Sequence, residues 1–262
     1  MIKINSCDEL IAWRKNINNN KVIGFVPTMG ALHRGHLSLI DSSILDCDIT
    51  IVSIFLNPKQ FGEGEDLHQY PSNIGADLEK LELKKVDAVF VPQTNDMFSK
   101  DDCFAVTETR SSLVLEGVSR PRFFSGVLTV VGKLFNMIYP SRAYFGKKDA
   151  QQLFLIEKMV SFMKYPIQII PCETVRRFNG LAESSRNQYL SKENQNEAGI
   201  IYSTLLEAQR MFMRGTKDAE CLRKHIESAL LSREKIRIDY VSVVNPDNLC
   251  KIEGEIVGSA LI

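Results

Sequence analysis

The feature that most constrains the fold is a strand–loop–helix–strand pattern near the amino terminus. Residues 22–26 (VIGFV) form a short β-branched run that stops at Pro27, and residues 49–55 (ITIVSIF) form a second apolar run. Runs of this length and composition are typical of strands buried on both faces of a parallel sheet. Between them, a segment with helical spacing of apolar residues begins at Leu32. The pieces together predict a βαβ unit.

The same alternation continues through the first two thirds of the chain. Further helices are predicted over residues 72–85, 127–139 and 149–165, and further strands over residues 88–91, 143–145 and 167–170. Alternating strands and helices predict an α/β fold with a Rossmann-like, doubly wound parallel sheet.

The alternation of strands and helices ends after Pro171. Two helical segments over residues 192–213 and 218–232 precede an alternating run over residues 236–244, which reads as a strand. We therefore expect a Rossmann-like domain over residues 1–175 and a small α+β domain over residues 176–262 that closes over the site.

Composition narrows the classes of partner. The 262 residues contain 32 basic and 32 acidic side chains, so no net charge favours nucleic acid or an anionic membrane surface. No apolar run reaches the ~20 residues of a membrane helix, and residues 1–10 lack the apolar core of a signal peptide. Six cysteines without a CxxC pair are typical of reduced thiols. These observations predict a cytoplasmic protein without nucleic-acid or membrane partners.

The motif with the clearest chemistry is PTMGALHRGHLSLI, which starts at Pro27 where the first strand gives way to the helix. Ligands of open α/β sheets bind beyond the carboxyl ends of the strands, and a helix N-terminus there suits phosphate. His33 and His36 lie three residues apart and therefore project from neighbouring positions of one turn. Gly35 leaves room for a nucleotide to approach the backbone. The alternative is a pair of surface histidines near a helix start.

Three further blocks, together with this motif, resemble the pantothenate synthetases of the HxGH nucleotidyltransferase superfamily. In the order of that family, they are SIFLNPKQFG from Ser53, YFGKKDAQQL from Tyr144 and GLAESSRN from Gly180. The resemblance spans residues 22–192. HxGH alone is a weak signal, whereas four ordered blocks identify a family.

The resemblance implies an AMP-forming carbon–nitrogen ligase of the coenzyme A pathway. Such an enzyme condenses (R)-pantoate with β-alanine through an enzyme-bound pantoyl adenylate, and it releases pyrophosphate and AMP. The resemblance also implies a homodimer that uses ATP with Mg²⁺, the metal being bound through the ATP phosphates rather than by protein ligands. Catalysis of such a displacement rests on positioning and electrostatic stabilisation.

The matching positions give the expected site residues. Those expected to stabilise the transition state are His33, His36, Lys148 and Arg186. Those expected to bind ATP are Met29, His33, His36, Gly146, Lys148, Asp149, Val175, Ser184, Ser185 and Arg186. Those expected to bind pantoate are Pro27, Thr28, Met29, Asn57, Gln60 and Gln152. The amides of the last three suit this substrate, because side-chain amides pair with hydroxyl and carboxylate without adding charge.

Several of these residues have a plainer interpretation. Without its neighbours, Lys148 would read as an ordinary solvated lysine, and the Ser-Ser-Arg-Asn run reads as a polar loop with a helix cap. Phe55 would be either an apolar wall for pantoate, with Met29, or core packing. Asn57 could simply shape the turn before Pro58, and Asp149 would either contact ribose or magnesium or cap a helix.

The sequence departs from the family pattern at four places. Phe123 stands where histidine is usual, so a polar role there is lost or passes to Arg122. Glu183 replaces an apolar residue and should repel triphosphate unless Arg186, Arg177 or magnesium compensates. Lys147 replaces an acidic residue, and the chain ends at Ile262, short of the usual C-terminal tail.

Three rival functions remain open from the sequence. The first is a nucleotidyltransferase that adenylylates a phosphate and therefore leaves AMP on its product. The second is a class I aminoacyl-tRNA synthetase fragment, which the absence of a KMSKS-like loop and of a basic face disfavours. The third is a non-catalytic nucleotide-binding module, which the intact set of histidines, lysine and arginine disfavours.

Overall fold

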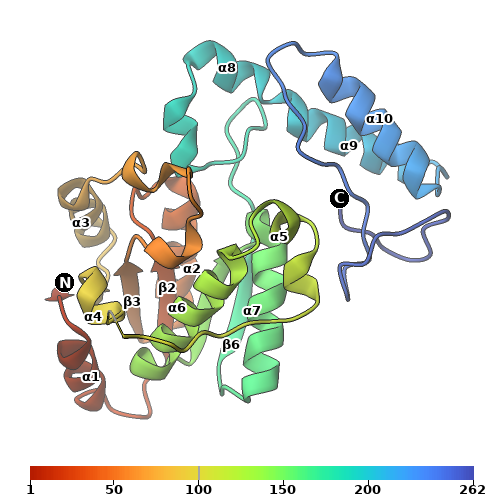
Figure 1. Ribbon diagram of the computed structural model, residues 1–262. Coiled ribbons are helices and arrows are strands. Elements are labelled where there is room, and N and C mark those ends of the chain that lie inside the picture. Colours follow the sequence, from red (N-terminus) through yellow and green to blue (C-terminus); the bar gives the residue numbers. More distant parts are fainter. Residues whose placement is uncertain (100) are drawn as a thin grey trace.

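A six-stranded, fully parallel sheet forms the centre of the protein in a computed structural model that describes residues 1–99 and 101–262. The strand order is β1-β4-β3-β2-β5-β6 (Figure 1). The strands are β1 (Ile2–Ile4), β2 (Ile23–Thr28), β3 (Ile49–Ile54), β4 (Ala88–Phe90), β5 (Arg142–Gly146) and β6 (Gln168–Cys172). The doubly wound α/β fold expected from the sequence is confirmed.

Helices cover both faces of this sheet. The α-helices are α1 (Cys7–Lys15), α2 (Arg34–Asp46), α3 (Ile74–Leu83), α4 (Thr94–Met97), α5 (Glu116–Ser119), α6 (Phe123–Ile138), α7 (Ala150–Met163), α8 (Lys192–Glu197), α9 (Ile200–Met213) and α10 (Ala219–Leu231). Short 3-10 turns are η1 (Pro58–Gln60), η2 (Asp66–His68), η3 (Ser111–Leu113), η4 (Lys147–Asp149) and η5 (Ser185–Tyr189).

The two faces of the sheet bury separate apolar clusters because side chains alternate along each strand. Phe25 and Ile51 pack with α1, α6 and α7, whereas Val26 and Val52 pack with α2 and α3. All four side chains are fully buried. Burial of each contributes roughly 1.5–3 kcal/mol, so one strand pair anchors both layers of helices.

The order of strands places a topological switch between β2 and β5. From β2 the chain moves outward through β3 and β4, and it later returns to the other side of β2 to form β5 and β6. The segments that leave the carboxyl ends of β2 and β5 therefore start side by side, which is where open α/β sheets bind ligands. The histidine motif follows β2, and η4 with Lys148 follows β5.

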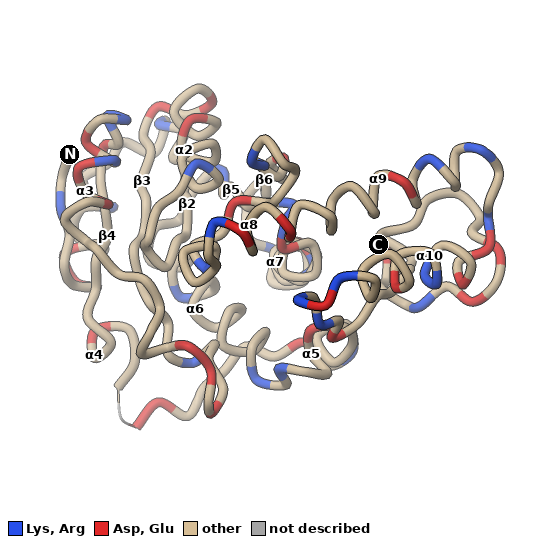
Figure 2. Tube along the Cα trace, turned by 90° about the horizontal axis from the view of Figure 1, so that it is seen from above, with Lys and Arg blue, Asp and Glu red and all other residues tan. Residues whose placement is uncertain are grey.

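The carboxyl-terminal part packs around α9 and α10, beyond the carboxyl ends of the strands (Figures 1 and 2). The strand predicted over residues 236–244 is wrong, because Val244 forms only isolated bridges with Lys251 and Leu261. Its alternation has another cause. Ile236, Ile238 and Val243 pack on the two helices without a neighbouring strand.

Other boundaries differ from the sequence expectation for local reasons. The helix expected over residues 192–213 is broken between α8 and α9, where a Cβ on Gly199 would lie 2.5 Å from the carbonyl oxygen of Asn179. Helix α6 begins four residues earlier than expected, without a side-chain cap. The sequence interpretation missed β1 and α1, since a three-residue edge strand carries almost no periodicity. The domain boundary after residue 175 stays a prediction.

Candidate functional site

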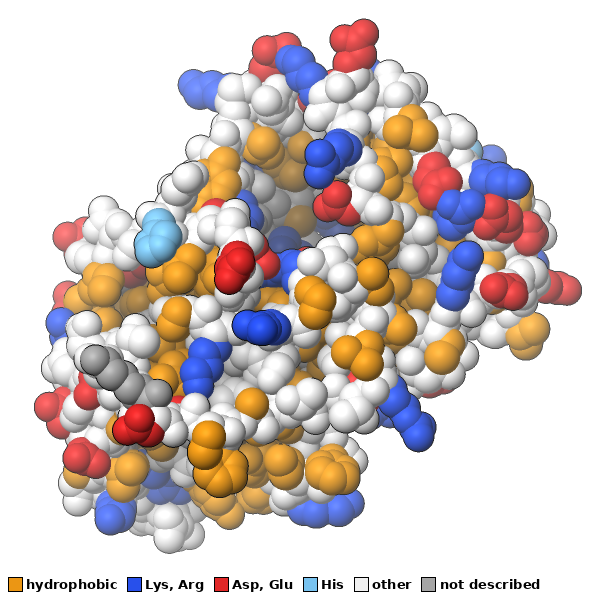
Figure 3. All heavy atoms as spheres, viewed as in Figure 1, with side chains coloured by type: hydrophobic (Ala, Val, Ile, Leu, Met, Phe, Trp, Pro, Cys, Tyr) orange, Lys and Arg blue, Asp and Glu red, His pale blue; other side chains and the backbone are white. Residues whose placement is uncertain are grey.

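A cavity of about 710 Å³ opens at the carboxyl ends of β2 and β5. Figure 3 shows the molecule hollowed there, with Lys and Arg side chains inside the hollow. The cavity lining includes each side chain or backbone segment expected to take part in catalysis or binding: Pro27, Thr28, Met29, His33, His36, Asn57, Gln60, Gly146, Lys148, Asp149, Gln152, Val175, Ser184, Ser185 and Arg186. These residues, which are far apart in the sequence, therefore share one cavity, while the role of each stays a prediction.

The two histidines form the first turn of α2. His33 occupies the N-cap position, where its Nδ1 accepts a hydrogen bond from the Gly35 N–H at 3.1 Å. His36 Nδ1 in turn accepts from the His33 N–H at 3.4 Å, so the pair forms a capping box made of imidazoles. The rings stack with centroids 4.0 Å apart. Each ring is thus held by a free N–H of the helix start.

These hydrogen bonds decide where the ring protons lie. A nitrogen that accepts from a backbone N–H carries no proton, so each neutral imidazole carries its proton on Nε2. Burial lowers the pKa of His36 to about 3, with contributions from His33, Lys148 and Lys80. Burial also lowers the pKa of His33, against the opposing effect of Glu183. Both rings are therefore neutral Nε2–H donors near pH 7.

A strained loop delivers the histidines from β2 to α2. Gly30 and Ala31 have φ angles of 86° and 50°, and alanine rarely adopts such a value. The Thr28 hydroxyl accepts from the Gly30 N–H at 3.2 Å, and the Ser185 hydroxyl donates to the Ala31 carbonyl at 3.2 Å. Side chains from separate parts of the chain thus hold a conformation that the loop would not adopt alone.

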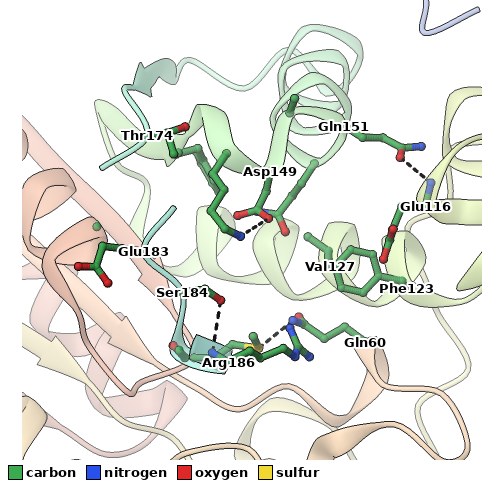
Figure 4. Close-up of a pocket in the computed structure, with 18 of the residues that line it drawn as sticks. Gln60, Glu116, Phe123, Val127, Asp149, Gln151, Thr174, Glu183, Ser184 and Arg186 are labelled. Carbon is green, nitrogen blue, oxygen red and sulfur yellow. Dashed lines mark hydrogen bonds and ion pairs between the residues drawn. The ribbon is translucent and has the colours of Figure 1, made fainter. Parts of the chain in front are cut away.

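Lys148 and Asp149 lie in η4, directly after β5. Lys148 Nζ is 3.2 Å from Asp149 Oδ1, and both side chains line the cavity (Figure 4). Asp149 holds the N-cap position of α7 but makes no capping hydrogen bond with its side chain. Its carboxylate therefore does not cap the helix, and Lys148 is the partner of its Oδ1.

The serine–arginine run forms the start of η5. Ser184 caps this turn by accepting from the Arg186 N–H at 3.3 Å. The Arg186 guanidinium donates from Nε and Nη2 to the Asp66 carboxylate at 2.9 and 2.8 Å, and the Tyr189 hydroxyl donates to the same carboxylate. Asp66 raises the pKa of Arg186, and its own pKa is lowered. Asp66 therefore orients the guanidinium and leaves Nη1 uncommitted to this pair.

Two of the three amides expected to bind pantoate, Asn57 and Gln60, belong to one hydrogen-bonded group. Asn57, which is 1% exposed, donates to Gln60 Oε1 and to the Gly126 carbonyl, both at 3.1 Å. Gln60 Nε2 lies 2.8 Å from Met29 Sδ. Asn57 also shapes the turn by accepting from the Lys59 N–H at 3.1 Å. The interpretation that Asn57 shapes the turn is confirmed, and the same side chain aligns Gln60, whereas its contact with pantoate stays a prediction.

Phe55 belongs to both the core and the cavity wall, and the two glutamines of α7, Gln151 and Gln152, have different surroundings. Phe55 is buried in the main apolar cluster and also lines the cavity, so it is both core and wall. Gln152 faces the cavity, as expected. The sequence interpretation gave Gln151 no role, yet its side chain holds the segment before α5 through Ser111, Val114 and the Glu116 N–H (Figure 4).

Arg120 is a residue of the cavity that the sequence interpretation missed. Its guanidinium lies 3.9 Å from the centre of the Phe123 ring and donates to Glu65 and to the Gln60 carbonyl. Of the two alternatives for Phe123, the structure favours loss of the polar role, because Arg122 is exposed and outside the cavity lining. Phe123 instead supports Arg120, and the signal in the sequence was an arginine three residues before an aromatic ring.

Two other departures from the family pattern, Glu183 and Lys147, each have a partner of opposite charge. Glu183 is 8% exposed, lines the cavity and lies 3.4 Å from Arg177 Nε, so Arg177 is the partner that compensates its charge. Lys147 pairs with Glu173 rather than facing the cavity.

Neither a protein-only metal site nor a membrane span is evident in residues 1–99 and 101–262. No group of three or more His, Cys, Asp or Glu side chains within those ranges is placed to hold a metal ion. No helix there is long and apolar enough to cross a bilayer.

Comparisons with known proteins agree with this geometry. The family model described as pantoate-beta-alanine ligase matches residues 2–262. A pantothenate synthetase from Pseudothermotoga lettingae is 45% identical, over 98% of this chain and 92% of the relative. Another from Acetivibrio thermocellus is 44% identical, over 99% and 91% of the two chains.

Solved structures give the same result for the fold. A crystal structure of pantothenate synthetase from Thermus thermophilus superimposes with a TM-score of 0.93 at 38% identity, covering 99% of this chain and 92% of that one. A pantoate-beta-alanine ligase from Francisella tularensis, complexed with beta-gamma ATP and beta-alanine, has a TM-score of 0.77 at 36% identity, with 88% and 86% covered.

Proposed function

The chain belongs to the pantoate-beta-alanine ligase family, and from this premise we propose that the cavity at the ends of β2 and β5 carries out the family's reaction with the residues described above. The protein is an ATP-dependent ligase that condenses pantoate with β-alanine. The observation that carries the assignment of roles is the convergence of His33, His36, Lys148 and Arg186 on one cavity.

Adenylation is the first step. A carboxylate oxygen of pantoate attacks the α-phosphorus of ATP, and the bond from that phosphorus to the bridging oxygen breaks as pyrophosphate leaves. The reaction develops charge on phosphoryl oxygens, which fixed donors stabilise. Neutral imidazoles that carry their protons on Nε2 supply such donors without a proton transfer. Lys148 supplies a point charge, and Arg186 supplies planar N–H groups.

Amide formation is the second step. The amine of β-alanine attacks the acyl carbon of the mixed anhydride, AMP leaves with the electron pair of the acyl–oxygen bond, and the amine loses a proton. Activation is necessary because a free carboxylate has no adequate leaving group. The cavity supports this step by enclosing the adenylate, since a hydrolysed intermediate would be lost to water.

Pantoate fits the part of the cavity between η1 and α7. Gln60 and Gln152 would pair with its hydroxyls and carboxylate, while Met29 and Phe55 would contact its dimethyl group. Asn57 acts mainly by aligning Gln60, because all three hydrogen bonds of its amide group are made within the protein. Pro27 and Thr28 form the floor at the end of β2.

The nucleotide fits the opposite part, between α2, η4 and η5. Met29, Gly146, Asp149 and Val175 would contact the nucleoside, with Ser184 and Ser185 on the phosphates. We propose that Mg²⁺ enters with ATP on its phosphate oxygens, a mode that needs few protein ligands.

The decisive experiment uses purified protein with ATP, Mg²⁺ and pantoate, before β-alanine is added. Pantoate-dependent pyrophosphate is expected first, and AMP together with pantothenate is expected once β-alanine is present. ADP and phosphate would rule out adenylation. A product that keeps AMP would favour transfer to a phosphate acceptor, and no turnover at all would favour a non-catalytic module.

We also propose that the protein is a cytoplasmic homodimer. All six cysteines are free, which fits a reducing compartment. Phe104, Leu113 and Val118, which precede α6, carry exposed apolar side chains of the kind that subunits bury. Sedimentation analysis at micromolar concentration would give the mass of a dimer, and a mass near that of a single 29.6 kDa chain would contradict this proposal.

A further inference from the structure

Two side chains of α3 hold the peptide units on either side of Leu32, the residue just before His33. The Leu32 N–H donates to Asp77 Oδ1 at 2.8 Å, and the Leu32 carbonyl accepts from Lys80 Nζ at 2.7 Å. Asp77 and Lys80 are themselves 3.4 Å apart, one turn along the helix. Asp77 is 1% exposed, although α3 contributes nothing to the cavity lining. An ion pair placed behind the site thus holds both polar groups of one loop residue.

The same peptide unit connects Lys80 to His36. The carbonyl that accepts from Lys80 belongs to the peptide between Leu32 and His33, whose N–H donates to His36 Nδ1 at 3.4 Å. An ammonium at the carbonyl draws electron density toward oxygen, which makes the N–H of that peptide a stronger donor. Stronger donation to Nδ1 favours the form of the imidazole whose proton is on Nε2.

We propose that Lys80, held by Asp77, is a positioning residue that fixes the orientation and the tautomer of His36 through the peptide between Leu32 and His33. The relay runs from the ammonium through one amide plane to the ring, and it aims the Nε2–H into the cavity. Lys80 acts through His36 and does not contact the substrates. The proposal rests on the proposed function only where it gives His36 a role on the triphosphate.

Other charges around the ring do not provide this relay. Lys148 reaches the histidines from η4 and Glu183 from the segment before η5, but neither bonds to the loop backbone between β2 and α2. His33 stacks on the ring and uses its own Nδ1 on Gly35. Among the described residues, Asp77 and Lys80 are the charged side chains that bond to the Leu32 backbone.

The direct test is a two-bond ¹H–¹⁵N correlation spectrum of protein labelled at histidine. The chain has only four histidines, so His36 can be assigned by comparison with His36→Gln. The expected wild-type pattern is a single Nε2–H tautomer. In Lys80→Met, a population with the proton on Nδ1 is expected to appear, and in Lys80→Arg, which keeps charge and donors, the wild-type pattern should return.

Kinetics give a second, independent reading. In Lys80→Met, kcat for pantoate-dependent pyrophosphate release should fall about tenfold, which corresponds to ~1.4 kcal/mol, while KM for ATP changes less than about threefold. Lys84→Met is the matched control. Lys84 holds the C-cap position of α3 and pairs with Asp41 at 2.7 Å through partly exposed side chains, so both readouts should stay at wild-type values.

An unchanged His36 tautomer in folded Lys80→Met would overturn the relay, whatever the activity. If Lys80→Met does not fold, Lys80→Gln is measured by the same two readouts, since it keeps a donor but no charge. A changed tautomer with normal kcat, together with full activity in His36→Ala, would uphold the relay and remove His36 from the proposed mechanism. The two ideas therefore fail separately.

Discussion

The depressed pKa of His36 makes a quantitative prediction about stability. Burial lowers this pKa from 6.5 to about 3 in the folded protein. Below pH 6.5 the unfolded chain therefore binds a proton that the folded chain does not, and the free energy of unfolding decreases as the pH falls. The slope approaches about 1.4 kcal/mol per pH unit for one proton. Between about pH 7.5 and 4.5, His36 alone should remove roughly 2–3 kcal/mol of stability.

This pH window isolates the histidines from the carboxylates. Arg120 lowers the pKa of Glu65, and Arg186 lowers that of Asp66, so both carboxylates also stabilise the folded state when ionised. Their contribution is fully present above the ordinary values of 4.5 and 3.8 and is lost only at lower pH. His33, whose pKa is also lowered, adds to the loss in the same direction as His36.

The assay is urea unfolding at half-unit steps from about pH 7.5 to 4.5. His36→Gln replaces the ring with a side chain that stays neutral, so its stability should decline by roughly 2 kcal/mol less than that of the wild type over this range. His68→Gln, which changes an exposed histidine in η2, controls for the loss of a ring. Parallel pH dependence in His36→Gln and the wild type would refute the idea that His36 is buried in its neutral form.

Three further outcomes are expected. His36→Ala should lower kcat for pyrophosphate release by at least tenfold with the fold intact, because loss of one transition-state donor costs about 2.7–4 kcal/mol; near-normal turnover would contradict the donor role. Gly126→Ala should lower the stability and raise KM for pantoate, since its Cβ would lie 2.2 Å from the Lys59 carbonyl in η1. An unchanged urea midpoint would show that η1 can move to accommodate the methyl group without a cost in stability. Glu183→Met should lower KM for ATP severalfold by removing a buried carboxylate from the cavity, and an increase in that KM would show that Arg177 depends on Glu183.

Features with a strong local pattern could be predicted from the sequence. The runs over residues 22–26 and 49–55 are apolar on both faces, so their place in the sheet centre follows from composition alone. The motif around His33 and His36 could be placed because a glycine-containing loop between strand and helix has one position in an open α/β sheet. Hence the fold class and the position of the histidine motif were accessible before any coordinates, whereas the other expected site residues came from the resemblance to a family.

Features that depend on tertiary partners could not be predicted. Residues 236–244 alternate as a strand does, but the partner is a helix pair, and periodicity does not distinguish the two. Arg120 and Asp66 carry no motif of their own, and their importance appears only when Glu65 and Arg186 lie against them. Asp77 and Lys80 read as ordinary polar residues of a helix, because nothing local reveals that they reach a loop 45 residues away.

The balance of charges in the cavity explains why a chain of zero net charge can bind a triphosphate. Lys148 lies next to Asp149 and Arg186 next to Asp66, so the field of each cation is largely cancelled at long range. At contact distance the cancellation ends, because a phosphate oxygen that meets Nη1 of Arg186 is nearer to the guanidinium than to Asp66. Association should therefore owe little to long-range attraction, and its rate should respond weakly to salt. A steep fall in the association rate of MgATP between about 50 and 200 mM salt would contradict this prediction. It would mean that Asp149 and Asp66 separate from Lys148 and Arg186 before the nucleotide binds.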